Sequence, residues 1–88
     1  LRPLQLFQPP RPIDVVGIAL DGPPAMFHYR RRRYRIARCV GPERIETGWW
    51  RGRTVGRDYY RVETAAGSHF WIFCRLRDRR WFLHGLFE

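Results

Sequence analysis

Short β-patterned segments separated by turn signals constrain this chain more than any other sequence feature. The clearest pair is Asp58–Thr64 and His69–Cys74, joined by the four residues Ala65–Ser68. β-Branched and aromatic residues are dense in both segments, and the glycine between them favours a tight connection. We therefore predict a β-hairpin here.

Further segments that are also rich in β-branched and aromatic residues lie on both sides of this hairpin. Turn signals such as Asp21–Pro24 separate them, and no segment of helical length shows a 3.6-residue apolar period. Residues 41–56 look irregular, with a short helical turn expected near residues 42–45. The other expected strands are Ile13–Leu20, Ala25–Tyr29, Tyr34–Arg38 and Trp81–Phe87. We predict an all-β fold, a small antiparallel meander of five or six strands that curls into a barrel-like rolled sheet.

The length of 88 residues allows one domain. Residues 1–12 contain four prolines, which lack a backbone donor, so we expect an extended arm or linker there and the β domain over residues 13–88. The chain begins with Leu1 rather than Met. We expect a domain taken from a longer intracellular protein.

Pairs of adjacent aromatic residues recur in the expected strands. Successive strand residues point to opposite faces, so Tyr59–Tyr60, Phe70–Trp71 and Trp81–Phe82 place an aromatic ring on each face of the sheet. Either another segment covers the second face, or this face is an exposed binding surface. The apolar residues of the arm that we consider as a cover are Leu4, Leu6 and Phe7.

The charge balance is strongly positive. The formal net charge is +9, and all 17 basic residues are arginine. Arginine suits phosphate and carboxylate partners, although a GC-rich genome also replaces lysine with arginine, and turns are often charged simply because they are solvated. The arginines that we consider for nucleic-acid contact are Arg30, Arg31, Arg32, Arg33, Arg51, Arg53, Arg57, Arg77, Arg79 and Arg80.

Catalytic and cofactor signatures do not stand out in the sequence. We find no nucleophile motif, phosphate loop or paired carboxylates, so we expect no enzyme activity and no cofactor. The spacing of the three histidines and two cysteines matches no zinc pattern, and we expect no metal. The cysteines indicate a reducing cytoplasm, and no apolar run is long enough for a membrane span.

Opposite charges also suggest a link between the irregular segment and the hairpin. We expect Arg57 and Asp58 to pair with Glu43 or Arg44. Such a pair would hold residues 41–56 against the strand that follows them.

Four sequence blocks form a family pattern. They are Pro42–Trp50 (PERIETGWW), Arg57–Glu63 (RDYYRVE), Phe70–Phe73 (FWIF) and Arg80–Phe87 (RWFLHGLF). Together they resemble the C-terminal domain of bacterial ImuB proteins, and the resemblance covers nearly the whole chain. ImuB proteins are similar to Y-family DNA polymerases of the DinB/UmuC type that have lost catalytic carboxylates.

This resemblance implies a bacterial, nucleoid-associated adaptor in the damage-inducible mutasome of the SOS response. The implied partners are an error-prone replicative-type DNA polymerase and an ImuA or RecA-like protein, with the sliding clamp bound through the parent chain. Gln5–Phe7 matches only part of the pattern of a clamp-binding peptide.

Three hypotheses for the role of the domain follow. The first is protein–protein contact through exposed aromatic residues, with arginines beside them. The second is direct binding of single-stranded or primer–template DNA, and the third is a structural cap on the parent polymerase-like domain. The aromatic residues that we expect at a partner surface are Trp49, Trp50, Tyr59, Trp71 and Trp81, although core packing is the alternative for the tryptophans.

Overall fold

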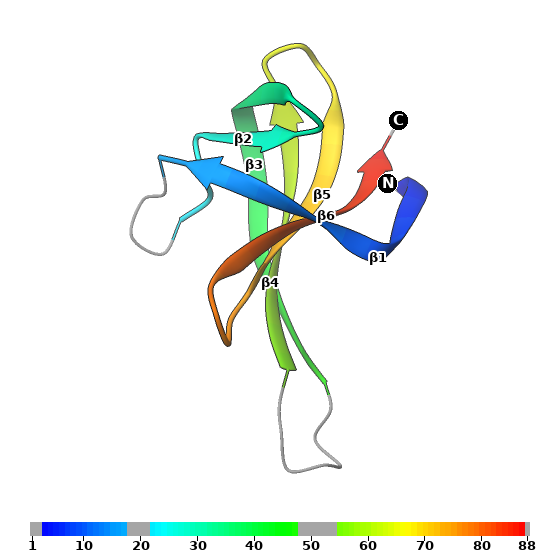
Figure 1. Cartoon of the computed structure of the whole chain (residues 1–88), viewed down its shortest axis with the longest axis vertical. Helices are drawn as coiled ribbons and strands as arrows, with labels where there is room; N and C mark the ends of the chain where they lie inside the picture. The colour runs from blue at the N-terminus through cyan, green and yellow to red at the C-terminus, as the bar shows by residue number, and fades with distance from the viewer. Residues whose placement is uncertain (1–2, 18–21, 48–54, 88) are drawn as a thin grey trace.

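The computed structural model describes residues 3–17, 22–47 and 55–87 (Figure 1). These residues form six antiparallel strands and no helix. The strands are β1 (Pro3–Val16), β2 (Met26–Tyr29), β3 (Arg32–Thr47), β4 (Val55–Thr64), β5 (His69–Arg75) and β6 (Arg80–Phe87). Each strand pairs with the next one, and β1 also pairs with β6, so the sheet closes into a ring. The predicted all-β, barrel-like rolled sheet is confirmed.

The β4–β5 hairpin forms where the sequence indicates it. Its register pairs Val62 with Phe70 and Tyr60 with Ile72. In the turn, the Ser68 amide donates to the Thr64 side-chain oxygen at 3.1 Å, and the Gly67 amide donates to the Thr64 carbonyl at 2.9 Å. These bonds satisfy the backbone where the chain reverses direction.

The expected proline-rich arm is extended, but it is part of the sheet. β1 begins at Pro3 and continues through residue 12 to Val16, pairing with β6 at Leu6 and again at Ile13. A register shift between the two paired stretches accommodates Pro9 and Pro10, which have no backbone donor. Residues 18–20 of the expected first strand lie outside the described residues. The division of the chain into an arm and a domain stays a prediction.

The helical turn expected near residues 42–45 is wrong. This stretch belongs to β3, where Arg44 pairs with Asp58 of β4. The side chains confirm the expected charge link, because the Arg44 Nε and Nη2 donate to the two Asp58 carboxylate oxygens at 2.8 and 3.1 Å. The bond from Arg44 lowers the pKa of Asp58, whose side chain is only 11% exposed. Pairing with β4 therefore overrides the weak local preference.

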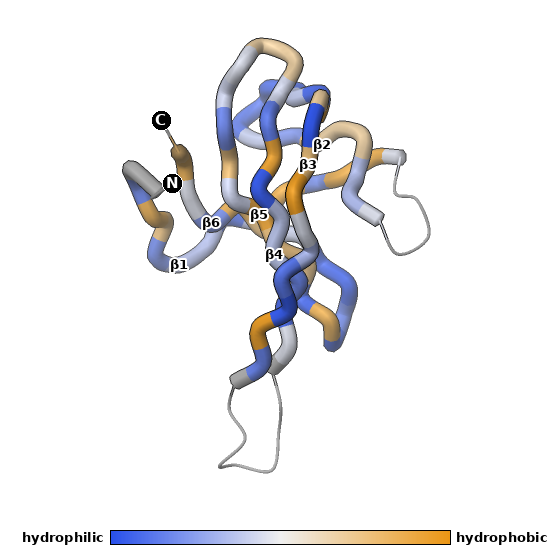
Figure 2. The backbone as a smooth tube through the Cα atoms, turned by 180° about the vertical axis from the view of Figure 1, so that it is seen from behind, coloured by the Kyte–Doolittle hydropathy of each residue, from blue (hydrophilic) through white to orange (hydrophobic). Residues whose placement is uncertain are grey.

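The interior of the ring holds the hydrophobic core. Strand alternation sends one member of each aromatic pair inward, namely Tyr60, Phe70 and Trp81. Phe7 of β1 is also part of this core, so it does not cover the outer face as considered above. Four core side chains are fully buried: Phe27, Val62, Ile72 and Leu83. Figure 2 shows the resulting alternation of hydrophobic and hydrophilic residues along the strands.

One glycine allows β3 to bend against β4. Gly41 has a φ of +133°, within a register shift between Val40 and Glu43. A Cβ at this position would lie 2.7 Å from the carbonyl oxygen of Tyr59, closer than atoms can approach without a backbone shift. The bend requires glycine for both reasons.

We predict that Gly41→Ala lowers the free energy of unfolding by about 2–3 kcal/mol, because it adds a backbone clash to an unfavourable φ. The matched control is Gly67→Ala, which has a positive φ of +92° but no atom within 4 Å of the added Cβ. The control should cost about 1 kcal/mol. Urea unfolding measures both, and equal losses would contradict the clash.

Candidate interaction surface

The outside of strands β4, β5 and β6 carries a continuous group of rings. We call the six residues Tyr59, Trp71, Phe73, Phe82, His84 and Phe87 the outer aromatic face. They are the outward partners of the core residues on the same strands, as the period of two requires. His84 is the extra residue in a register shift, where Trp71 pairs with Gly85 and Ile72 pairs with Leu83.

The rings of this face are stacked. The Trp71 and His84 ring centroids are 5.1 Å apart with planes 3° from parallel, and Tyr59 lies 4.5 Å from Trp71 on the same face. Phe73 and Phe82 form a second stack at 5.1 Å. Such contacts add to the stabilisation from burial and restrict the ring orientations. The stacking buries Phe73, at 2% exposure, and Tyr59, at 5%, so the accessible part of the face is formed by the partly exposed Trp71, Phe82, His84 and Phe87.

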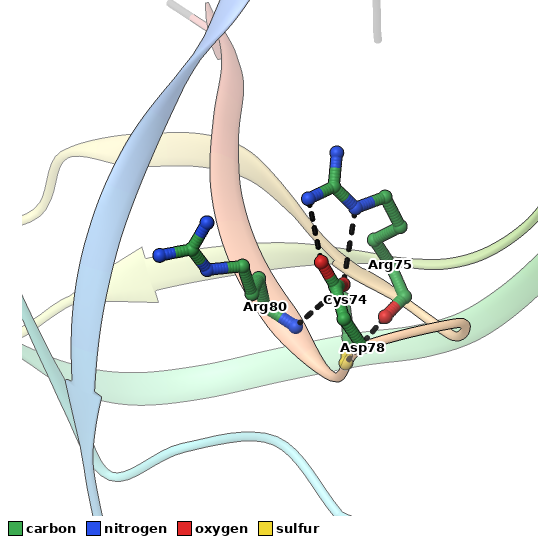
Figure 3. Close-up of polar contacts among 4 residues, drawn as sticks. All are labelled: Cys74, Arg75, Asp78 and Arg80. Atoms are coloured by element: carbon green, nitrogen blue, oxygen red, sulfur yellow. Dashed lines mark hydrogen bonds and ion pairs between the residues drawn. The ribbon is translucent and has the colours of Figure 1, made fainter.

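Two arginines lie on the rings. The guanidinium carbon of Arg57 is 4.5 Å from the Phe73 centroid, and that of Arg75 is 4.8 Å from the Phe82 centroid. Arg75 also donates to both oxygens of Asp78, at 3.0 and 2.7 Å (Figure 3), and this pairing lowers the pKa of Asp78 to about 2. Arg57, in contrast, donates to the Tyr59 hydroxyl at 3.0 Å. The charge of Arg75 is thus neutralised locally, whereas Arg57 forms no ion pair with the described residues.

A hydrogen-bonded chain crosses the face from Arg57 to His84. The Tyr59 oxygen accepts from Arg57 and lies 2.9 Å from His84 Nδ1. The Tyr59 hydroxyl and His84 Nδ1 share one hydrogen bond, in which the imidazole tautomer sets which atom donates. Burial lowers the pKa of His84, and the positive charge of Arg57 lowers it further. Nε2 is buried and has no hydrogen-bond partner among the described residues.

A groove of about 580 Å³ runs along the edge of the outer aromatic face. Tyr59 and Trp71 form one wall, and the bent part of β3 with Val40 and Gly41 forms the other. The Val40 side chain is exposed, at 59% for the residue. An aromatic wall facing an exposed aliphatic side chain suits an apolar or aromatic side chain of a partner protein.

Of the five aromatic residues expected at a partner surface, Tyr59 and Trp71 lie together on the outer aromatic face; Trp71 is partly exposed, and Tyr59 is 5% exposed beneath the neighbouring rings. Trp81 is 7% exposed and packs against Tyr60 in the core, which was the alternative for the tryptophans, because its position in β6 points inward. Trp49 and Trp50 lie outside the described residues, and their role stays a prediction. The other four members of the face were not expected from the sequence. The strand period of two would have indicated Phe73, two residues after Trp71, and His84, two residues after Phe82.

The expected arginines fall into separate places. Arg30 and Arg31 form the turn between β2 and β3, and Arg32 and Arg33 begin β3. Arg77 and Arg79 lie in the turn after β5, and Arg80 begins β6. The two groups lie on either side of β1: Arg30 and Arg31 line one hollow with residues 12–14, and Arg79 and Arg80 line another. Arg57 lies on the outer aromatic face, and Arg51 and Arg53 lie outside the described residues.

Within the described ranges, no three side chains of the metal-binding types gather at one place, and no helix there is long and apolar enough to cross a membrane. Cys39 and Cys74 are free thiols whose pKa values are raised by burial.

We predict that His84 titrates below its ordinary pKa of 6.5, because burial and the charge of Arg57 both disfavour the imidazolium. Arg57→Gln should raise this midpoint, and Arg77→Gln, which removes an equal charge from the β5–β6 turn, should leave it in place. Since the folded pKa is the lower one, stability should fall as the pH drops through 6.5. NMR titration of the His84 ring measures the midpoint, and a value at or above 6.5 would contradict the arrangement.

Comparison with curated proteins finds two relatives, both "Protein ImuB" of Caulobacter vibrioides, from strain NA1000 / CB15N and from strain ATCC 19089 / CIP 103742 / CB 15. Each is 42% identical over an alignment 100 residues long, which covers 98% of this chain. The chain spans 22% of the length of these relatives. No family model matches the chain, and no solved structure matches it.

The relatives and the fold agree with the four sequence blocks. Three of these blocks form β4, β5 and β6, which carry the outer aromatic face. The resemblance inferred from the motifs is confirmed: nearly the whole chain is similar to a domain-sized part of ImuB, consistent with the C-terminal domain of that protein.

Proposed function

We propose that this chain is a non-catalytic adaptor domain in damage-induced, error-prone translesion DNA synthesis. The similarity to ImuB supports a role in the mutasome family. The proposed partners are an error-prone replicative-type DNA polymerase and an ImuA or RecA-like protein. Such a role places the domain in the bacterial cytoplasm near the nucleoid.

The outer aromatic face with its groove is the observation that carries this proposal. It combines stacked rings, an exposed Val40, and the charged Arg57 held on the ring of Phe73. Aromatic residues and arginine are the side chains that contribute most to protein–protein binding energy. A partner segment with an apolar anchor for the groove, whose lining also holds Glu43 and Arg61, and with an acidic residue for the neighbouring Arg57 would match this surface.

We expect Trp71→Ala to weaken binding of the polymerase or of the ImuA-like protein at least about tenfold, because it removes one wall of the groove. Val40→Glu should weaken binding as well, through an exposed site whose substitution leaves the core intact. The matched control is Val16→Ala, another exposed aliphatic residue of a strand, at 48% exposure. Calorimetry or surface plasmon resonance with each purified partner measures the affinities.

Circular dichroism and the urea midpoint of each variant establish that it is folded. Unchanged binding by both the Trp71 and the Val40 variant would exclude this face as the contact surface. A loss as large in Val16→Ala would mean that the effect is not local. The combined Trp49→Ala and Trp50→Ala variant tests separately the two predicted residues that lie outside the described ranges.

The structural cap is the second use that we propose for the same face. In a longer parent chain, these rings would then pack against the polymerase-like domain, and the groove would be filled. A parent chain in which Trp71→Ala lowers the unfolding temperature more than it does in this domain alone would favour the cap. An equal effect in both would favour a surface free for partners.

A further inference from the structure

We propose that a second site, which shares only Phe87 with the outer aromatic face, binds single-stranded DNA at one end of the ring. A cavity of about 660 Å³ opens there. It lies between the β2–β3 turn, the start of β5, residues 5–11 of β1 and the end of β6. This volume lies in the range of small-ligand sites, and it is larger than the groove beside Trp71.

Aromatic and basic side chains both line its wall. Its rings include the partly exposed Tyr29 and Tyr34 besides the buried Phe7, and its guanidinium groups are those of Arg11, Arg30 and Arg32. The described residues that line it include no Asp or Glu. Stacking surfaces next to phosphate-binding groups are what an unpaired nucleotide requires, since its base has a flat face and its phosphate a negative charge.

These arginines are unneutralised and oriented. Arg11 lies 5.1 Å from the centroid of Phe7, and Arg30 lies 5.6 Å from that of Tyr29. Arg11, Arg30 and Arg32 form no ion pair with any of the described residues, unlike Arg44 and Arg75. A guanidinium that stacks on a ring keeps its N–H donors in its own plane, where they are available to phosphate oxygens.

The backbone of the β2–β3 turn supports a role beyond solvation. Arg30 and Arg31 have φ values of 52° and 65°, so both central residues of this tight turn are left-handed. Such turns favour Asn-Gly, and each arginine there costs roughly 1–2 kcal/mol of backbone strain. Solvation alone does not account for arginine at these strained positions, and we attribute both arginines to binding of a polyanion.

A buried polar atom points to the same place. The Tyr29 hydroxyl is buried and has no hydrogen-bond partner among the described residues. Tyr29 and Arg30 also line a neighbouring hollow of about 360 Å³ that includes Arg31 and the carboxylate of Asp14. The two hollows share Tyr29 and Arg30, so a ligand longer than a single small anion spans both, with its phosphates on the side of the arginines.

The test uses fluorescence anisotropy with a labelled oligothymidylate of about 15 nucleotides at low salt. The variant is Arg30→Asn combined with Arg31→Gly, which removes two charges and also relieves the turn. We expect it to raise the unfolding temperature while it weakens DNA binding at least about tenfold. The slope of log affinity against log salt should decrease by about 0.7 for each phosphate that the variant no longer neutralises.

The matched control is Arg77→Gln combined with Arg80→Gln, which removes the same charge beyond the opposite end of β5. It should weaken binding less than about threefold. Tyr29→Leu, which leaves all the arginines, should weaken binding without changing the salt slope, because stacking involves no counterion. Trp71→Ala should bind the oligonucleotide normally, so failure of this site and failure of the protein-contact proposal are distinguishable.

Several outcomes would overturn the proposal. They are an absence of binding by the parent domain at low salt, an equal loss in the control pair, or unchanged affinity in the turn variant. Competition by polyglutamate as effective as by unlabelled oligonucleotide would assign the site to acidic protein segments instead. Preference for duplex over single-stranded DNA would exclude stacking of unpaired bases as its basis.

Discussion

Backbone pairing between β1 and β6 is the constraint on which the rest of this structure depends. It closes the sheet, so that neither outermost strand is left as an unpaired edge. It also turns one face into an interior, which a chain of 88 residues needs in order to bury enough apolar surface. The proline-rich N-terminal segment is therefore structural, and Phe7 contributes directly to the core.

Closure explains why the aromatic residues occur in adjacent pairs. One ring of each pair fills the interior, and the other is left on the outside of the ring of strands. On β4, β5 and β6 the outward rings lie close enough to stack on one another, and Arg57, Tyr59 and His84 connect them by hydrogen bonds. The groove beside them exists because β3 bends at Gly41, where a side chain would meet the backbone of Tyr59.

The arginines have different contacts in the structure, although each adds the same charge to the composition. Arg44 and Arg75 bind carboxylates within the domain, and Arg57 lies on a ring. Those of the β2–β3 turn line an uncompensated cavity at one end, and those after β5 lie at the other end. The net charge of +9 therefore does not mark a single basic surface among the described residues but is spread over several separate local environments.

The sequence by itself determined the local elements and the likeness to part of ImuB. The hairpin at Ala65–Ser68, the all-β class and the aromatic residues on both faces follow from a period of two and from turn chemistry, which are local properties. The motif blocks led to ImuB, and the comparison agrees.

The tertiary structure alone decided what depends on residues far apart in the chain. Residues 42–45 are a strand because β4 supplies their backbone partners, and Trp81 is core because the ring closes around it. The alternation rule shows that Trp71 and Trp81 point to opposite faces but not which face becomes the interior. That choice is made by β1, near the other end of the chain, when it pairs with β6.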